Sequence, residues 1–149
     1  MKALDRAVEG AVLLWLATAD EKGKPNVSPK EIWVRDGDYL LIADIASARS
    51  VENLRANPQA SASFIDILRQ KGVQTKGRAE IIGPDDEDFA EVHAPLAEKA
   101  GPDFPIRNVI RLNMTEIFPI IAPSYALQPE KSEAERIAEA KAAYGFSAD

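Results

Sequence analysis

Apolar and polar residues alternate with a period of two in several parts of the chain, the pattern typical of β-strands. Segment 72–82 shows this most clearly, because small or apolar residues take every second position while Gln, Lys, Arg and Glu take the positions between them. Other segments are short apolar runs of strand length between turn residues. Six strands are therefore predicted, at 11–18, 26–35, 39–44, 60–66, 72–82 and 108–121.

Two tight-turn signals join the first three predicted strands. Gly23 lies in the run 20–25 and Gly37 lies between two aspartates, and glycine provides the positive φ that hairpin turns require. We therefore expect these three strands to form an antiparallel meander. The strand at 11–18 is apolar almost throughout, which predicts that both of its faces are covered.

Helical periodicity and helix-end signals predict helices around the strands. Proline and acidic residues open one of them at Pro84–Glu87, and Gly101 follows its expected end. The predicted helices span 2–9, 48–57, about 84–100 and about 132–144. Six short strands around one core, with helices at the periphery, predict a mainly β fold in the form of a six-stranded antiparallel barrel. We expect a single domain over 1–149, with the barrel at about 11–121.

A serine-rich helix start directly follows the strand predicted at 39–44. Ser47, Arg49 and Ser50 lie at this start, and Pro58 ends the helix. The first turn of a helix has N–H groups without intrahelical partners and carries the positive end of the helix dipole, so it favours anions. Hydroxyl donors and a forked guanidinium suit phosphate oxygens. The pattern indicates a phosphate site, although a serine N-cap followed by an exposed arginine would give the same sequence.

The segment 26–31 does not have the pattern of a buried strand. Alternation places Asn26, Ser28 and Lys30 on one face. Pro29 lacks an N–H and restricts the residue before it, so we expect the segment at a sheet edge or bend with exposed backbone. Exposed backbone beside Ser and Lys would suit the polar edge of a flat heterocycle. The alternative is a plain polar face on an edge strand, where Lys and Pro prevent edge-to-edge pairing.

Polar side chains also follow one face of the strand predicted at 72–82. Lys76 and Arg78 lie on this face together with Gln74 and Glu80. Such a face is usually solvated surface. If it borders a ligand, a cation there would stabilise the anion of a reduced ring.

The composition of the chain excludes several kinds of catalysis and metal site and argues against some binding partners. The chain of 149 residues has a formal net charge of −6 and only 7% aromatic residues, which argues against a nucleic-acid-binding barrel and against binding to an anionic membrane. It has no cysteine, which excludes disulfides, thiolate catalysis and cysteine-ligated metals. A single histidine, His93, excludes a metal site built from several histidines of one chain, and no nucleophile motif lies beside it. A start without a signal-peptide core, together with short apolar runs, predicts a cytoplasmic protein.

Three parts of the chain, taken in order, form a recognisable pattern: Leu16–Ala19 followed by Gly23–Lys30, then Ser47–Pro58, then Gly77–Glu80. Together they resemble the pyridoxamine 5′-phosphate oxidase-like, FMN-binding split-barrel family, over roughly residues 5–125. The resemblance implies a six-stranded antiparallel split β-barrel, a homodimer, and one FMN in each of two clefts at the subunit interface. The cofactor would carry the redox chemistry, so no metal is expected and catalytic residues stay unassigned.

The resemblance implies cofactor-binding roles for three groups of residues. The helix start after the third strand holds the FMN phosphate, the second-strand segment lines the isoalloxazine ring, and the fifth strand borders the flavin. The charge of Lys30 or Lys76 would favour a reduced, anionic flavin. The residues concerned are Ser47, Arg49 and Ser50 for the phosphate, Val27, Ser28, Pro29 and Lys30 for the ring, and Gln74 and Lys76 on the fifth strand.

The chain also departs from the oxidase after which this family is named. Ser28 stands where that oxidase has an arginine, and Pro29, Lys30 and Glu31 stand where it has aliphatic residues. The oxidase has a further C-terminal segment that helps to bind the substrate phosphate, whereas this chain continues into 122–125 and a charged helix. Oxidation of pyridoxamine phosphate is therefore not expected.

The leading hypothesis is a homodimeric FMN-dependent oxidoreductase that receives electrons from a small molecule or a redox protein. One alternative is a non-enzymatic electron carrier or FMN store. Another is a split barrel whose cleft holds a deazaflavin or haem, and the single histidine, His93, counts against haem ligation. We expect neither a nucleic acid nor a membrane as partner.

Overall fold

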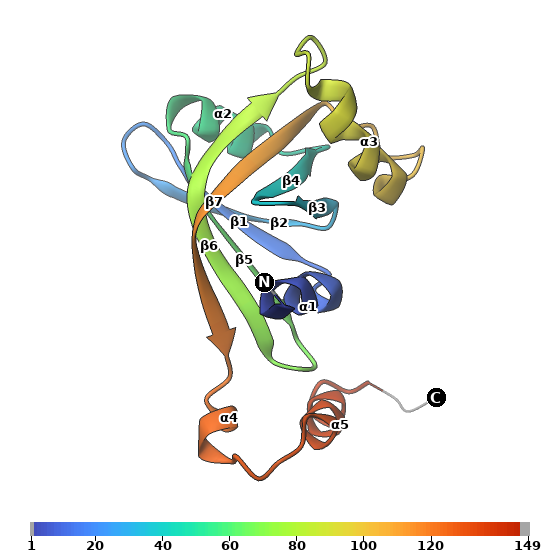
Figure 1. The fold of residues 1–149 in the computed structure, drawn as a ribbon. Helices are drawn as coiled ribbons and strands as arrows, with labels where there is room; N and C mark the ends of the chain where they lie inside the picture. Colours follow the sequence, from blue (N-terminus) through green and yellow to red (C-terminus); the bar gives the residue numbers. More distant parts are fainter. Residues whose placement is uncertain (1, 147–149) are drawn as a thin grey trace.

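Figure 1 shows the computed structural model of the protein, in which residues 2–146 are described. A curled β-sheet forms its centre, with helices around and below the sheet. The strands are β1 (Leu14–Ala19), β2 (Pro25–Lys30), β3 (Trp33–Asp36), β4 (Tyr39–Asp44), β5 (Gln59–Asp66), β6 (Lys71–Ile82) and β7 (Asn108–Ile121). The helices are α1 (Lys2–Gly10), α2 (Ala48–Ala56), α3 (Phe89–Ala100), α4 (Ser124–Leu127) and α5 (Glu133–Ala143).

The seven strands form one antiparallel sheet in the order β2-β1-β5-β6-β7-β4-β3. Its two edge strands, β2 and β3, follow each other in the chain and are separated only by Glu31 and Ile32. The sheet must therefore curl until its two edges approach each other, which makes it an open barrel. The N–H of Ala43 donates a hydrogen bond of 3.0 Å to the carbonyl of Ile32 and ties this crossing to β4.

The predicted mainly β fold with peripheral helices is confirmed, but the prediction of six strands is wrong. The strand expected at 26–35 is two strands, because the chain breaks at 31–32 to cross from one sheet edge to the other. The expected meander is not formed, since β2 pairs with β1 whereas β3 pairs with β4. Pro29 does lie on an edge strand, as its missing N–H predicts.

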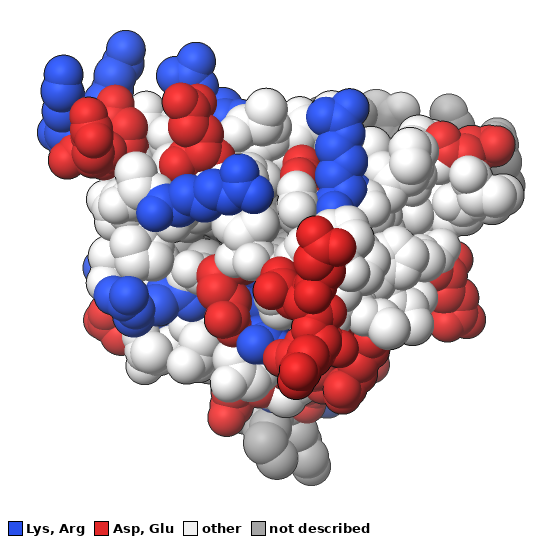
Figure 2. Space-filling model, turned by 90° about the horizontal axis from the view of Figure 1, so that it is seen from above, with Lys and Arg blue, Asp and Glu red and all other residues white. Residues whose placement is uncertain are grey.

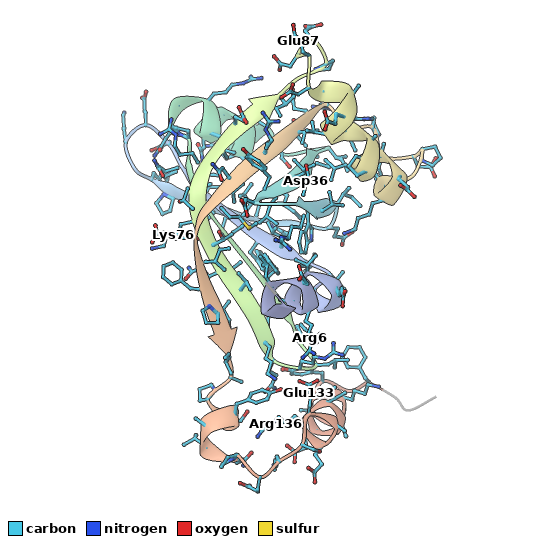
Figure 3. All side chains as sticks on the ribbon, viewed as in Figure 1. Arg6, Asp36, Lys76, Glu87, Glu133 and Arg136 are labelled. Atoms are coloured by element: carbon cyan, nitrogen blue, oxygen red, sulfur yellow. The ribbon has the colours of Figure 1, made fainter. Side chains whose placement is uncertain are left out.

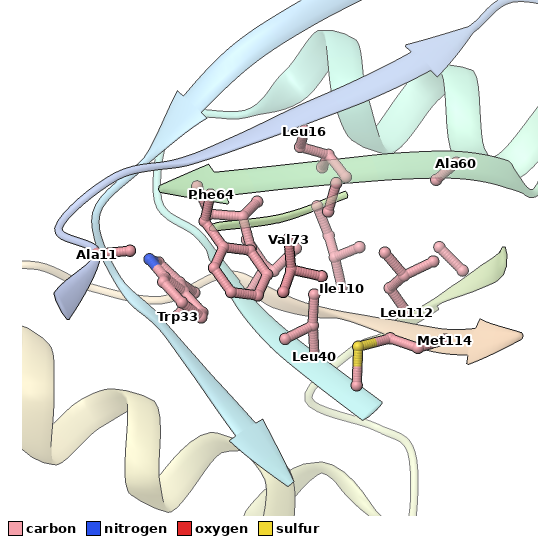
Figure 4. Close-up of a cluster of buried hydrophobic side chains, with 14 of the residues drawn as sticks. Ala11, Leu16, Trp33, Leu40, Ala60, Phe64, Val73, Ile110, Leu112 and Met114 are labelled. Atoms are coloured by element: carbon pink, nitrogen blue, oxygen red, sulfur yellow. The ribbon is translucent and has the colours of Figure 1, made fainter. Parts of the chain in front are cut away.

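A cluster of buried aromatic and aliphatic side chains fills the barrel (Figure 4). Trp33 and Phe64 pack against each other with ring centroids 4.9 Å apart, and each exposes only 1% of its surface. β6 follows the predicted period of two, which directs one face of the strand into this core. Val73, Thr75, Gly77 and Ala79 are buried, and Gln74, Lys76, Arg78 and Glu80 are exposed.

Gly77 marks an irregularity in the pairing of the two longest strands. The register of β6 and β7 shifts between Lys76 and Gly77. A Cβ atom at Gly77 would lie 1.7 Å from the carbonyl oxygen of Asn113, so a side chain would collide with the backbone of β7. Glycine thus permits the close approach of the two strands at this bulge.

Two smaller expectations are wrong. Within the single chain, β1 is not covered on both faces, since Trp15 is 46% exposed. α3 begins at Phe89 rather than near Pro84, because the residues before it form turns around Asp86. The carboxylate of Asp86 accepts a hydrogen bond from the N–H of Gly83, and its carbonyl accepts one from the N–H of Phe89.

The C-terminal helix is observed close to its predicted bounds, in an arm of α4 and α5 that lies below the barrel in Figure 1. Tyr125 joins the arm to the barrel, because the Lys71 ammonium and the Arg136 guanidinium lie 4.1 and 4.2 Å from its ring centroid. Glu133 adds ion pairs to Arg69 and Lys71. None of the helices within residues 2–146 is long and apolar enough to cross a membrane.

Candidate functional site

A cleft of about 510 Å³ lies between β2 and the start of α2. Its volume is within the range of about 300–1,000 Å³ that is typical of small-molecule sites. Two sequence segments that we expected to bind a cofactor meet in it. The expected residues that line the cleft are Ser28, Pro29, Lys30, Ser47, Arg49 and Ser50.

β2 presents one face to the cleft. Asn26, Ser28 and Lys30 alternate with exposed residues along this edge strand and line the cleft together, as the period of two predicts. Lys30 is the last residue of the strand and is only 8% exposed. Val27 lies on the opposite face and is 60% exposed. Lys30 is therefore the most buried residue of β2.

The first turn of α2 supplies backbone donors. Ser47 precedes the helix, and its N–H is already donated to the Asp44 carboxylate at 3.0 Å. The carbonyl of Ser47 accepts a hydrogen bond of 3.0 Å from the N–H of Val51. The N–H groups of 48–50 have no hydrogen-bond partner within residues 2–146. Together with the helix dipole, these three N–H groups can receive an anion.

Side chains of β2 and of the α2 start contact each other. The hydroxyl oxygens of Ser28 and Ser50 lie 3.3 Å apart, and the ammonium of Lys30 donates to the hydroxyl of Ser47. Burial lowers the pKa of Lys30, whereas the negative charge of Asp44 acts to raise it. One cation and three hydroxyl groups are thus held together beside the helix start.

Asp44, the last residue of β4, is part of this arrangement, and the sequence reasoning missed it. Its side chain is buried, and its second carboxylate oxygen accepts a hydrogen bond from the Asn108 amide at 2.7 Å. The available signal was its spacing, because an aspartate three residues before Ser47 is placed to accept a backbone N–H at a helix entry. That signal is weak without knowledge of the packing around it.

Apolar side chains complete the cleft. Ile32, Ala43, Ile45 and Phe104 line it together with the polar groups. Phe104 comes from the loop between α3 and β7 and is 55% exposed. Nothing in the sequence pattern predicts Phe104 at this site. The cleft therefore combines cationic and hydroxyl groups with apolar surface, which suits a ligand that has an anionic group and a flat apolar part.

The positive charge of the cleft is local. Arg49 is exposed at the cleft, and none of the described residues forms an ion pair with it. Glu31 also lines the cleft and is exposed. Figure 2 shows Lys and Arg interspersed with Asp and Glu over the face seen from above, with acidic side chains gathered in one area.

Three of the expected cofactor-binding residues lie outside this cleft, on the outer face of the sheet. Val27 is paired with Ala17 on β1, and Lys76 is paired with Ser61 on β5. Since Ala17 and Ser61 also pair with each other, Val27 and Lys76 lie in one row across four strands. Lys76 points away from the barrel (Figure 3) and lines a separate hollow of about 300 Å³. Gln74 is exposed two residues before it on the same face.

The single histidine lies away from the cleft. His93 is on α3, where its ring packs against Phe89 with ring centroids 4.9 Å apart. Its imidazole is not among the groups that line the cleft. In the part of the chain that the structure describes, no group of three or more His, Cys, Asp or Glu side chains is placed to hold a metal ion.

The family of the chain follows from a match over most of its length. The sequence model of pyridoxamine 5′-phosphate oxidase matches residues 1–120. The chain belongs to the pyridoxamine 5′-phosphate oxidase family. The resemblance based on the three motifs is therefore confirmed, and the match extends over the barrel to the end of β7.

The chain is similar to a curated relative, the haem oxygenase HutZ of Vibrio cholerae serotype O1, and the two are 32% identical over 96 residues. The aligned part is 59% of this chain and 53% of HutZ. The chain thus spans about half the length of the curated relative that it matches.

Solved structures share the fold. HupZ of Group A Streptococcus has a TM-score of 0.67 at 21% identity, over 80% of this chain and 92% of HupZ. HutZ of Vibrio cholerae, described as a haem storage protein, has a TM-score of 0.65 at 24% identity, over 76% and 89% of the two chains. An FMN-binding protein of Syntrophomonas wolfei has a TM-score of 0.66 at 16% identity, over 81% and 88%. These structures establish the split-barrel fold, and two of them are named for different ligands, haem for HutZ and FMN for the Syntrophomonas wolfei protein.

Proposed function

We propose that the protein is an FMN-binding flavoprotein and acts as an FMN-dependent oxidoreductase. The observation that carries this proposal is the cleft in which Lys30, Arg49 and three hydroxyl groups lie beside the N–H groups of 48–50. Such donors suit a phosphate with a charge of about −2. The apolar part of the cleft, with Ile45 and Phe104, suits the flat ring of a flavin.

Several moderate contributions would combine at the phosphate. An anion at a helix N-terminus gains about 0.3–1 kcal/mol, and a hydrogen bond to a charged group contributes about 1.5–3 kcal/mol. Lys30 is buried, so solvent and salt screen its charge less than that of the exposed Arg49. Riboflavin, which has the same ring but no phosphate, should therefore bind much more weakly than FMN.

The proposal includes a homodimer with one FMN in each of two interface clefts. Val27, Gln74 and Lys76 lie on the outer sheet face, away from the cleft of their own chain. That face also exposes 46% of Trp15 and 41% of Phe118, and apolar surface of this kind favours burial against a partner. A second copy on this face would bring its Gln74 and Lys76 towards a ring bound by the first copy.

In such a site the cofactor and the protein would have separate roles. FMN, when bound, supplies hydride or electron transfer. Lys30, Arg49 and the α2 start would bind and orient the phosphate end, and the cations near the ring would favour the reduced, anionic form. The same site would serve a carrier that only exchanges electrons with a small molecule or redox protein. The lack of cysteine agrees with the cytoplasmic location that we propose.

Haem is the main alternative, because HutZ is named both as a haem oxygenase and as a haem storage protein. Haem iron is usually held by a His, Cys, Met or Tyr side chain. None of these residue types is among the described residues that line the cleft. The groups present therefore fit the phosphate of FMN better than the iron of haem. A deazaflavin that carries a phosphate would use the same contacts, so it is one outcome of the test.

The test is a titration of the purified protein with FMN, riboflavin, a deazaflavin and haem, followed by visible absorbance and flavin fluorescence. We expect FMN to bind one per chain, and riboflavin to bind at least about tenfold more weakly. Equal affinities for FMN and riboflavin would remove the phosphate assignment. Saturable binding of haem or of the deazaflavin, without binding of FMN, would overturn the proposal. Steady turnover of reduced nicotinamide with an electron acceptor would then separate an enzyme from a carrier.

A further inference from the structure

Asp44 joins three segments of the chain beside the proposed phosphate site. One carboxylate oxygen accepts the N–H of Ser47 at 3.0 Å, and the other accepts the side-chain amide of Asn108 at 2.7 Å. The backbone carbonyl of Asp44 accepts the N–H of Arg107 at 2.8 Å. The end of β4, the entry to α2 and the start of β7 therefore converge on this one residue, which is 4% exposed.

A buried carboxylate at this place is unexpected on electrostatic grounds alone. Its negative charge would repel a phosphate bound at the neighbouring helix start. Within residues 2–146 no Lys or Arg forms an ion pair with it. Both of its oxygens instead accept hydrogen bonds from neutral donors. Any favourable role of Asp44 in binding the phosphate must therefore be indirect and act through the neighbouring groups.

We propose that Asp44 is the positioning residue of the phosphate-binding turn, and that Asn108 supports it from β7. The inference rests on the proposed function, since it assigns the part that Asp44 plays in binding the FMN phosphate. By accepting the N–H of Ser47, Asp44 fixes the entry to α2, so that the N–H groups of 48–50 are left for the ligand. Its charge also acts to raise the pKa of Lys30, which burial lowers, and so partly offsets the effect of burial.

The replacement Asp44→Asn distinguishes this role from simple repulsion of the phosphate. The two interpretations predict opposite changes in FMN affinity. If Asp44 were only a nearby negative charge, its removal would tighten FMN binding. If it positions the turn, the asparagine must weaken binding. An amide at residue 44 cannot accept hydrogen bonds from both Ser47 and Asn108, since its NH₂ group would face another donor.

A second variant tests the hydrogen bond itself. The exchange Asp44→Asn with Asn108→Asp restores one donor and one acceptor between the two side chains and returns the negative charge to the site. It should recover much of the affinity that Asp44→Asn alone loses. Asn108→Ala removes the supporting donor but keeps the charge of Asp44, so it should weaken FMN binding in the same direction.

The pH dependence of binding gives a readout that a purely structural role would not change. The carboxylate of Asp44 from β4 acts on the charge of Lys30, and the other charged residues that line the cleft with Lys30 are Arg49 from α2 and the adjacent Glu31. The cation is present below its pKa, so FMN affinity should decline as the pH rises through that value. Without the negative charge of Asp44, the pKa of Lys30 falls further, and the decline should move to lower pH.

The experiment measures Kd for FMN and for riboflavin over a range of pH, in the wild-type protein and in Asp44→Asn, Asn108→Ala and the exchanged pair. Asp36→Asn is the matched control, because it removes one negative charge from an exposed residue at the β3–β4 hairpin, outside the cleft (Figure 3). We expect Asp44→Asn to weaken FMN binding at least about tenfold. Riboflavin binding and the control should be unchanged.

The outcomes are distinguishable from failure of the proposed function. Wild-type protein that binds no FMN refutes the proposed function itself. If the wild type binds FMN and Asp44→Asn binds it equally or more tightly, only the role of Asp44 is overturned. Circular dichroism shows whether Asp44→Asn is folded; if it is not, Asn108→Ala decides the question, since unchanged FMN affinity in that variant also overturns the role.

Discussion

Replacing Arg49 by alanine should weaken FMN binding while the stability of the protein stays the same. Arg49 is exposed at the cleft and forms no ion pair with the described residues, so its removal leaves no buried group unpaired. Arg49 belongs to the first turn of α2, whose unpaired N–H groups form the proposed phosphate site. The substitution should therefore weaken FMN binding without lowering the stability of the fold.

The expected loss of FMN affinity in Arg49→Ala depends on how exposed the Arg49 side chain is. A hydrogen bond between charged groups contributes about 1.5–3 kcal/mol, which corresponds to about 10- to 150-fold in Kd. Because Arg49 is exposed, solvent screening places its contribution near the lower limit. Arg49→Glu adds repulsion from the phosphate of about 1 kcal/mol or more at contact distance, so its Kd should rise at least about fivefold further.

Arg55→Ala is the matched control for this prediction. Arg55 is an exposed arginine in the last turn of the same helix and does not line the cleft. Quenching of flavin fluorescence gives Kd, and thermal unfolding without ligand gives stability. An FMN affinity that stays unchanged in Arg49→Ala, or that falls equally in Arg55→Ala, would refute the assignment of the phosphate to this helix start.

Three further predictions concern the cleft and the barrel. FMN affinity should decline as the pH rises, because burial lowers the pKa of Lys30 and its cation is lost above that value; titrations over about pH 6–10 check this, and Lys30→Met should flatten the profile. Gly77→Ala should lower the free energy of unfolding, measured in urea, by about 1–3 kcal/mol or more, because the added Cβ would collide with the carbonyl of Asn113. Unchanged stability would show that the backbone at the bulge can move to accommodate a side chain. Trp33→Ala should cost about 3–5 kcal/mol in the same assay, since the ring is 1% exposed, and a loss below about 1 kcal/mol would contradict its place in the core.

The interior of the barrel could be predicted from the sequence because it depends on a local pattern. From Val73 to Glu80 the residues of β6 alternate between buried and exposed, and the structure buries Thr75 and Ala79 while it exposes Lys76 and Arg78. The edge position of Pro29 follows from its missing N–H in the same direct way. These features need no information about distant parts of the chain.

The number of strands could not be predicted in this way. Pro29 predicts a sheet edge or bend in segment 26–35, but the strand-like composition continues across Glu31 and Ile32, so the sequence does not place a break there. The break exists because the closing sheet requires the chain to cross between two edges at that point. The same limit explains why Asp44 and Phe104 were missed, since each reaches the cleft only through tertiary contacts.

Some of the expected site residues line the cleft and others lie on the outer face of the sheet, and this separation has a physical reason. Successive residues of a strand point to opposite faces, so Val27 and Ser28 point to opposite faces of β2, although Pro29 also lines the cleft. Ser28 and Lys30 therefore line the cleft, whereas Val27 lies on the outer face with Lys76. A site that used all of these residues would need two chains, which is the arrangement that we propose.

Closure of the sheet is what creates the cleft. In the strand order β2 and β4 are five positions apart, which would be about 24 Å in a flat sheet with a strand spacing of about 4.8 Å. Yet the ammonium of Lys30 at the end of β2 contacts the hydroxyl of Ser47 just beyond β4. The groups that we propose to bind the phosphate therefore come together only when the two edges of the sheet approach at 31–32. A ligand that bridges β2 and the α2 start would in turn hold these edges together, so binding and barrel closure should stabilise each other.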